Sequence, residues 1–387
     1  MHLIDNLEVG GAQQCVSTLA KYWPTEEYPL LVCAMADGPM RSIIEQAGVP
    51  VKIIRRPRCT IVLFPVYFVE LFRIWCKLSR LVKENRVALI QTHIAGVMDF
   101  VALGLRMSGH VRRAVWTIHG VDFLPLRPGP ALAVRRLLFR FLYRISATRI
   151  DRFVAVSKAV RQAILQQIGS TTNKIVTIPN GTSLEIGQIS GSKTKLCKEL
   201  ALHDQVRIIL TVGRLSQEKG HRYLIEAAGE VVCADPDVHF LIAGDGEDEE
   251  QLKEQARLSG CVENIHFLGS RTDVHVLLAA ANLFVLPSLR EGLSIALLEA
   301  MAAGLAVVAT SIAGTREVVT SGETGVLVPP SNSAALARAI MGLLRDPDRG
   351  RTMGRAARQH VLENYSAPKQ AHDYLAFYRE LLEAGPD

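Results

Sequence analysis

Short apolar runs alternate with amphipathic stretches along most of this chain. An apolar run of roughly four to eight residues between turn residues is typical of a buried strand, and apolar positions three and four residues apart are typical of a helix. Their alternation predicts βαβ units and parallel sheets in an α/β fold. Strands are expected near residues 2–5, 30–34, 51–54, 89–92, 113–118, 152–156 and 174–178, then near 207–212, 238–243, 265–268, 283–286, 306–309 and 325–328.

A polar segment at residues 184–195, rich in Gly and Ser and without periodicity, separates the two sets of strands. It predicts a linker between two Rossmann-like domains, 1–185 and 196–366. Residues 367–387 are expected to form a terminal helix that packs back on the first domain. Because ligands of doubly wound folds bind outside the carboxyl ends of the strands, we expect the binding site in a cleft between the two domains.

Basic residues are concentrated in the first half of the chain. Residues 1–185 hold 24 Lys and Arg against 12 Asp and Glu, whereas residues 186–387 hold 20 against 26. Residues 51–149 alone hold 18 basic and 4 acidic residues. This asymmetry predicts an anionic partner, namely a membrane surface, a nucleic acid or an acidic acceptor. No nucleic-acid-binding module is recognisable, so nucleic acid is not expected.

Two stretches of this basic region, residues 64–86 and 131–149, mix Arg and Lys with Leu, Phe, Tyr and Trp. Helices of this kind can lie in the interface of an anionic bilayer. They can also pack on their own sheet with solvated arginines outside, and the sequence leaves both interpretations open. No apolar run reaches the ~18 residues of a membrane span, and no N-terminal signal is recognised. The expected location is therefore the cytoplasm, peripheral on the inner face of the plasma membrane.

The seven cysteines are scattered and form no Cys-x-x-Cys pair. Their odd number and irregular spacing predict reduced thiols in a cytoplasmic protein and no zinc site. Each of them, including Cys59, Cys76 and Cys233, is expected to be a buried apolar side chain.

One segment of the second half carries the most informative pattern. Glu291 and Glu299 lie eight positions apart, with Gly292, Leu293 and Ser294 between them and an apolar run just before. The order strand, loop, helix is predicted, with the second glutamate about two turns into the helix. Free N–H groups at the start of that helix favour a phosphate, and the carboxylates can accept hydrogen bonds from hydroxyls. A ligand with hydroxyls on both sides of a phosphate is a nucleotide sugar, although two glutamates so placed can also be merely solvated.

A second segment follows the first strand of the second half. Arg214 and Lys219 stand five residues apart, where a planar guanidinium and an ammonium can converge on one diphosphate. Gly244 begins a partial dinucleotide fingerprint, but position 249 is Glu and not the third glycine, so NAD is not assigned. Asp-x-Asp occurs at 235–237 and 346–348, outside these segments, but no His/Asp cluster with metal-ligand spacing accompanies it, and no metal is expected.

The first half offers fewer candidates. Gly10 and Gly11 form a loop before a predicted helix, where the backbone can approach a ligand closely. His119 ends a predicted strand and is followed by Gly, which places it at the edge where a ligand would bind. His93 has a similar position, but we interpret it as structural.

Together these segments resemble the motifs of retaining family 4 glycosyltransferases, from about residue 3 to residue 365. The specific pair is Glu-x7-Glu, followed by Gly304, and the Gly-Arg-Leu-x-x-x-Lys-Gly form of 213–220. Weaker matches occur at 156–158, 178–181, 243–246, 314–317 and 325–330. The resemblance implies a GT-B type fold, with two Rossmann-like domains around a cleft, an N-terminal domain that holds the acceptor and a C-terminal domain that holds the nucleotide sugar.

The resemblance also implies residue roles. Glu299 would hold ribose hydroxyls, and Glu291 with the amides of Gly292, Leu293 and Ser294 would hold the donor sugar and phosphate. Arg214 and Lys219 would contact the diphosphate and stabilise it as the leaving group without a metal or cofactor. His119 would contact the transferred sugar or the reacting centre. Gly11 and Gly244 would approach the donor, and Gly10, Gly11 and His119 would face the acceptor.

The function expected from the resemblance is retaining transfer of a hexosyl group from a nucleotide sugar such as a UDP-sugar to a hydroxyl. The basic first half favours a membrane-associated or lipid-linked glycan as acceptor, as in bacterial cell-surface polysaccharide or lipopolysaccharide synthesis. Two alternatives stay open: a nucleotide-sugar epimerase on the same architecture, and a non-catalytic sugar-nucleotide-binding protein.

Overall fold

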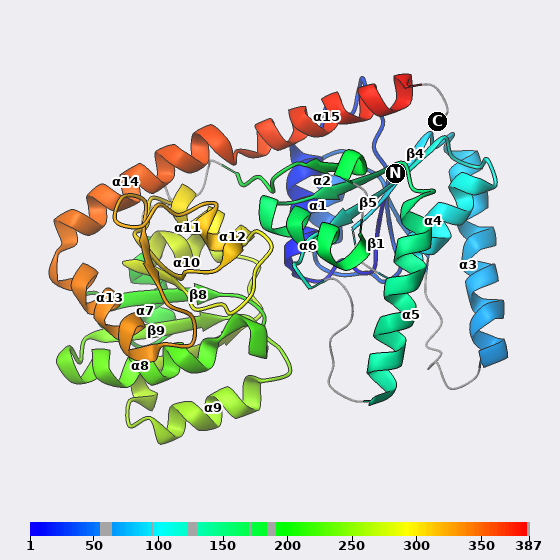
Figure 1. Cartoon of the computed structure of the whole chain (residues 1–387). Coiled ribbons are helices and arrows are strands. Elements are labelled where there is room, and N and C mark those ends of the chain that lie inside the picture. The colour runs from blue at the N-terminus through cyan, green and yellow to red at the C-terminus, as the bar shows by residue number, and fades with distance from the viewer. Residues whose placement is uncertain (55–63, 94–95, 123–129, 170–171, 184–190, 385–387) are drawn as a thin grey trace. The chain divides into compact units, whose positions relative to one another are not determined.

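The computed structural model describes residues 1–54, 64–93, 96–122, 130–169, 172–183 and 191–384. Contacts divide the chain into two compact units. Unit 1 comprises Met1–Asn180 with Pro368–Asp387, and unit 2 comprises Gly181–Ala367. Each unit is a parallel sheet covered by helices (Figure 1).

Unit 1 contains a seven-stranded parallel sheet of order β3-β2-β1-β4-β5-β6-β7. The order reverses between β1 and β4, which makes this pair the topological switch point of a doubly wound fold. The strands are β1 (His2–Ile4), β2 (Val32–Ala34), β3 (Val51–Ile53), β4 (Leu89–Thr92), β5 (Arg113–Ile118), β6 (Arg152–Ala155) and β7 (Ile175–Thr177). The helices that connect them are α1 (Gly11–Lys21), α2 (Met40–Gln46), α3 (Phe64–Glu84), α4 (Val97–Met107), α5 (Pro130–Ala147) and α6 (Lys158–Ile168).

Unit 2 contains a six-stranded parallel sheet of order β10-β9-β8-β11-β12-β13, with its switch point between β8 and β11. The strands are β8 (Arg207–Val212), β9 (Val238–Ala243), β10 (Ile265–Gly269), β11 (Leu283–Leu286), β12 (Val307–Thr310) and β13 (Val326–Val328). The helices are α7 (Ser192–Glu199), α8 (His221–Ala234), α9 (Glu249–Leu258), α10 (Val274–Ala280), α11 (Ile295–Ala302), α12 (Ala313–Arg316), α13 (Ser333–Arg345) and α14 (Pro347–Asn364).

The terminal helix α15 (Ala367–Glu383) belongs to unit 1 from Pro368 onward, although it follows unit 2 in the sequence. Its residues Tyr374, Phe377 and Leu381 are buried in the apolar core beside β1 and β2. Its last carbonyl oxygens accept hydrogen bonds from Arg112 and Arg113. Cationic donors at a helix carboxyl end satisfy free carbonyls and the helix dipole, so α15 is held at both its apolar face and its end.

Two expectations from the sequence are wrong in part. The expected linker at 184–195 overlaps α7, which begins at Ser192, and residues 184–190 lie outside the described residues. Cys76 and Cys233 are exposed and not buried, because they fall on outer faces of their helices; Cys59 also lies outside the described residues. Within the described segments, no helix is long and apolar enough to cross a membrane.

Candidate functional site

The two segments singled out in the second half follow adjacent strands. The loop after β8 carries Arg214 and Lys219, and the loop after β11 carries Glu291. Because β8 and β11 pair in parallel at the switch point of unit 2, both loops emerge at the carboxyl edge of the sheet, side by side. That edge is where doubly wound folds bind ligands.

An ion pair joins the two loops. Lys219 Nζ lies 2.7 Å from Glu291 Oε1, and Ser288 Oγ donates to the same oxygen at 2.8 Å. The side chains of Lys219 and Glu291 are 24% and 8% exposed, so little solvent screens the pair. Both recorded contacts use Oε1, which leaves Oε2 available to accept a hydrogen bond from a ligand.

The helix after the second loop begins at a capped end. Ser294 is the N-cap of α11, and its hydroxyl accepts a hydrogen bond from the amide of Leu297. Glu299 lies inside α11 and is half-buried. Burial raises the pKa of its carboxyl group to about 7, because desolvation disfavours the charged form.

Glycines allow four loops of this edge to pack backbone against backbone. A Cβ on Gly244, whose φ is +141°, would lie 2.0 Å from the carbonyl oxygen of Gly213. A Cβ on Gly220 would lie 2.3 Å from the oxygen of Pro287, and one on Gly314 would lie 2.6 Å from the oxygen of Gly292. The loops after β8, β9, β11 and β12 are therefore fixed against one another by close approaches that only glycine permits.

The remaining polar groups of this edge can form further hydrogen bonds or ion pairs. Arg214 is exposed and forms no ion pair with any residue that the structure describes. Ser216 Oγ and His221 Nδ1 are buried without a hydrogen-bond partner in the described residues. Burial, and after it the charge of Lys219, lowers the pKa of His221 to about 4. Because buried polar atoms normally have a partner, these groups suit a polar ligand.

In unit 1, His119 directly follows β5 and is half-buried. Its Nε2 lies 3.2 Å from Nδ1 of His93, which follows the neighbouring strand β4. Burial lowers the pKa of His119 to about 4, so its ring is neutral at pH 7. The structure thus gives His93, interpreted from the sequence as structural, a contact with the site candidate. The contact follows from the pairing of β4 with β5, since each of the two histidines comes directly after one of these strands.

Gly10 and Gly11 lie at the start of α1, where Gly10 is the N-cap. A Cβ on Gly11 would meet nothing within 4 Å, and one on Gly10 would meet only the flexible end of Gln13. Packing inside unit 1 therefore does not demand glycine at these positions. Packing does require glycine at position 38, because a Cβ on Gly38 would lie 2.3 Å from the backbone of Leu7. No motif in the sequence indicated this requirement.

A row of exposed apolar side chains covers one face of α5. Leu137 and Phe141, for example, are 69% and 58% exposed. Arg140 and Arg144 donate to the last carbonyl oxygens of α6, although Arg144 also stays exposed. The row consists of Leu137, Leu138, Phe141, Leu142 and Ile145, and is called the α5 row below.

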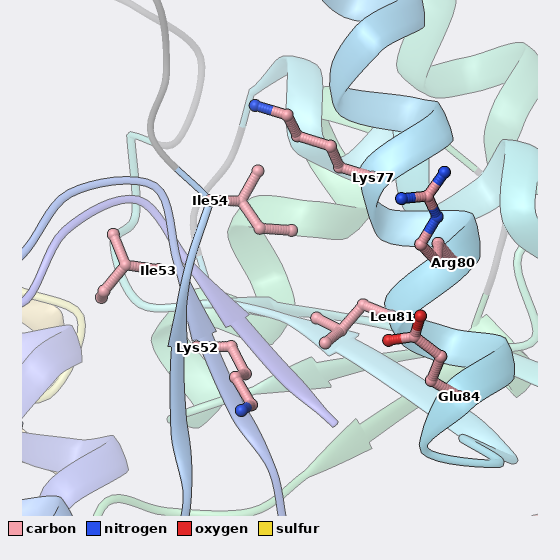
Figure 2. A pocket seen from close by; sticks show the side chains of 7 residues that line it. All are labelled: Lys52, Ile53, Ile54, Lys77, Arg80, Leu81 and Glu84. Atoms are coloured by element: carbon pink, nitrogen blue, oxygen red, sulfur yellow. The ribbon is translucent and has the colours of Figure 1, made fainter.

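A basic hollow of about 470 Å³ lies between β3, the edge strand of unit 1, and α3. Figure 2 shows Lys52 from the strand and Lys77 and Arg80 from the helix around it, with Glu84 as the single acidic residue of its lining. Its remaining lining residues are apolar. The hollow carries none of the site residues expected from the sequence.

Comparison with known proteins agrees with this architecture. Residues 192–360 match the family model "Glycosyl transferases group 1", and residues 9–186 match "Glycosyltransferase Family 4". The chain is 30% identical to the alpha-maltose-1-phosphate synthase of Mycolicibacterium smegmatis over 71% of the chain and 76% of that protein. It is 26% identical to the UDP-Gal:alpha-D-GlcNAc-diphosphoundecaprenol alpha-1,3-galactosyltransferase of Escherichia coli, over 79% and 78%.

Among solved structures, Anabaena Alr3699/HepE in complex with UDP and glucose superposes with a TM-score of 0.82 at 22% identity, covering 98% of each chain. This likeness confirms the expected GT-B type fold. Together with the family models and the mycobacterial relative, it leads to one conclusion: the chain belongs to the family 4 glycosyltransferases.

Proposed function

We propose that this protein transfers a hexosyl group from a UDP-sugar to a hydroxyl of a lipid-linked or membrane-embedded glycan, with retention of anomeric configuration and without a metal ion. The ion pair between Lys219 and Glu291 at the switch point of unit 2 is the observation that carries the donor site. The Escherichia coli relative is named for UDP-Gal and the Anabaena structure is a complex with UDP, which supports the choice of nucleotide.

In this proposal unit 2 holds the donor. Glu299 accepts hydrogen bonds from ribose hydroxyls, and Glu291 Oε2 accepts one from the sugar. The phosphates lie at the start of α11, beside the backbone of Gly292, Leu293 and Ser294, because a helix N-terminus favours negative charge. Gly244 lets the loop after β9 approach the donor.

Arg214 and Lys219 stabilise the diphosphate as it leaves. The exposed guanidinium of Arg214 has no ion pair in the described residues to give up, and the ammonium of Lys219 has further donors beyond the one directed at Glu291. Fixed cations beside a developing charge supply the largest catalytic effect in many enzymes. Two cations at this position replace the charge that a metal ion would provide.

Unit 1 binds the acceptor, through Gly10, Gly11 and His119. The acceptor hydroxyl attacks C1 on the face that the diphosphate leaves. The C1–O bond to the phosphate breaks, the new C1–O bond forms, and the acceptor proton passes to a phosphate oxygen. No protein nucleophile is assigned, and Glu291 binds substrate and does not act as a base.

The α5 row and the basic hollow support a membrane-bound acceptor. Contiguous exposed apolar side chains mark interaction surfaces, and apolar residues beside cations suit an anionic bilayer. The protein would then work in the cytoplasm, peripherally on the inner face of the plasma membrane. Co-sedimentation with anionic liposomes at low salt tests this part, and failure to bind would remove it.

The transfer itself is tested by following UDP release from UDP-sugars, with membrane extract as acceptor and a chelator present. Glu299→Ala should weaken donor binding and Arg214→Ala should slow transfer, whereas Arg257→Ala, on the exposed last turn of α9, should change neither. Wild-type rates in the first two variants would refute the site. Release of an altered sugar nucleotide without acceptor would favour the epimerase alternative.

A further inference from the structure

A continuous chain of side-chain hydrogen bonds runs through the core of unit 1 to His119. His119 Nε2 contacts His93 Nδ1 at 3.2 Å, and His93 Nε2 contacts His2 Nδ1 at 2.6 Å. His2 Nε2 contacts the hydroxyl of Tyr378 on α15 at 3.1 Å. The chain thus joins β1, β4, β5 and the terminal helix.

Tyr378, at the end opposite His119, determines the direction in which these hydrogen bonds run from donor to acceptor. The hydroxyl of Tyr378 donates to Oε1 of Gln91, whose Nε2 donates to Thr117 Oγ1 at 2.7 Å. An amide oxygen only accepts hydrogen bonds, and a hydroxyl has one hydrogen to donate. Toward His2, the Tyr378 oxygen must therefore accept, and His2 must carry its proton on Nε2.

Each neutral imidazole then fixes the next, because it has one N–H and one lone pair. His2 Nδ1 is an acceptor, so His93 is protonated on Nε2. His93 Nδ1 is in turn an acceptor, so His119 is protonated on Nε2. The last ring is left with a lone pair on Nδ1, which has no recorded partner in the described residues.

Neutrality of all three rings is consistent with their surroundings. His2 and His93 are 1% and 2% exposed. Burial, and after it neighbouring positive charge, lowers the pKa of both well below the usual histidine value. The titratable groups that face these side chains are the N-terminal amino group, the histidines themselves, Tyr378, Tyr374 and Cys15, and among the described residues no carboxylate contacts them.

We propose that Tyr378, His2 and His93 are positioning residues that hold His119 in its Nε2–H tautomer, so that His119 Nδ1 accepts a hydrogen bond from a hydroxyl of the bound sugar or acceptor. The sugar contact rests on the proposed function; the tautomer does not. Beyond Tyr378 these hydrogen bonds pass through the amide of Gln91, which cannot take up a proton, so they orient His119 and do not conduct protons.

The tautomers are measured directly by long-range ¹H–¹⁵N correlation spectra of protein labelled at histidine. All three rings should be protonated on Nε2 in the full-length protein. A His119 protonated on Nδ1 would overturn the proposal, since it would mean that the chain has the opposite polarity. This measurement needs neither donor nor acceptor.

Tyr378→Phe removes the acceptor for His2 Nε2–H and leaves that donor buried and unsatisfied. If the hydrogen bonds between the three rings reverse direction, His2 no longer carries a buried, unsatisfied proton on Nε2. His119 should therefore shift toward the Nδ1–H tautomer. Tyr28→Phe is the matched control, because Tyr28 also binds α15, through Arg379, but lies outside the chain. If the histidine tautomers of Tyr378→Phe were unchanged, as in the control, the proposed dependence of the His119 tautomer on Tyr378 would be contradicted.

Kinetics separate the two ring nitrogens of His119. In His119→Asn an amide atom stands near the position of Nδ1, and in His119→Gln near that of Nε2. The Asn variant should retain more kcat/KM, by about threefold to tenfold, the range that one ordinary hydrogen bond supplies. Better retention in Gln would refute the role of Nδ1. Wild-type rates in both variants would instead refute His119 as a site residue while leaving the tautomer result intact.

Discussion

Gly314→Ala tests the close packing on which the donor site depends. A Cβ at this position would lie 2.6 Å from the carbonyl oxygen of Gly292 and 2.7 Å from that of Glu291, whereas ordinary contact begins near 3.4 Å. The loop after β11 must therefore withdraw by about 0.8 Å, the difference between 3.4 and 2.6 Å. The backbone at Gly314 has no positive φ, so the effect is one of contact and not of backbone strain.

A displacement of about 1 Å in a positioning group can lower a rate about a hundredfold, and overpacking a tight site costs about 1–3 kcal/mol of stability. We expect Gly314→Ala to lower kcat/KM for the donor by about one to two orders of magnitude and the melting temperature by a few degrees. Steady-state kinetics and calorimetry measure both.

Gly342→Ala is the control for this prediction. Gly342 lies on α13, is exposed, and a Cβ there would meet nothing within 4 Å. Alanine should stabilise this helix by about 0.5–1 kcal/mol without affecting transfer. If Gly314→Ala behaved like Gly342→Ala, the close approach between the loops would not govern the site.

Three further predictions follow from the charges and surfaces described. Lys219→Met should lower the free energy of unfolding by about 1–2 kcal/mol in denaturant titrations, because it leaves the mostly buried Glu291 carboxylate without its cation; an unchanged midpoint would contradict the pair. Burial raises the pKa of Glu299 to about 7, so Glu299 should bind the donor better as it ionises. Donor affinity, measured by titration calorimetry, should rise up to about tenfold from about pH 6 to about pH 8. Glu299→Gln should abolish this pH dependence of donor affinity. Phe141→Asp in the α5 row should lower liposome affinity at least about tenfold. Leu258→Asp, at an even more exposed apolar residue of α9, should not; equal losses would refute the row as the contact.

The sheets could be predicted almost completely from the sequence. All thirteen expected strands occur, because buried parallel strands form apolar runs that turn residues delimit. The helix that begins at residue 192 was harder to predict, because α7 is short and polar and its helical pattern spans barely two turns. Helix boundaries of this kind depend on tertiary contacts more than on local propensity.

The sequence indicates candidate residues for the site but not the contacts between them. Motif spacing identifies Lys219 and Glu291, yet only the pairing of β8 with β11 brings their charges together. His93 and Tyr378 are separated from His119 by long stretches of chain, and no periodicity links them. The arginines of α5 show the same limit, because the ends of α6 that they bind are set by packing.

Donor binding by the intact protein tests the central claim most directly. Thermal stability should be measured without metal against a panel of nucleoside diphosphates and their sugar conjugates, in the wild type and in Glu299→Ala. A ligand that binds only the folded state raises the melting temperature by mass action. UDP and its sugar conjugates should raise the melting temperature of the wild type, and Glu299→Ala should greatly reduce this shift. No shift with any nucleotide, or an equal shift in the variant, would contradict the donor site assigned to unit 2.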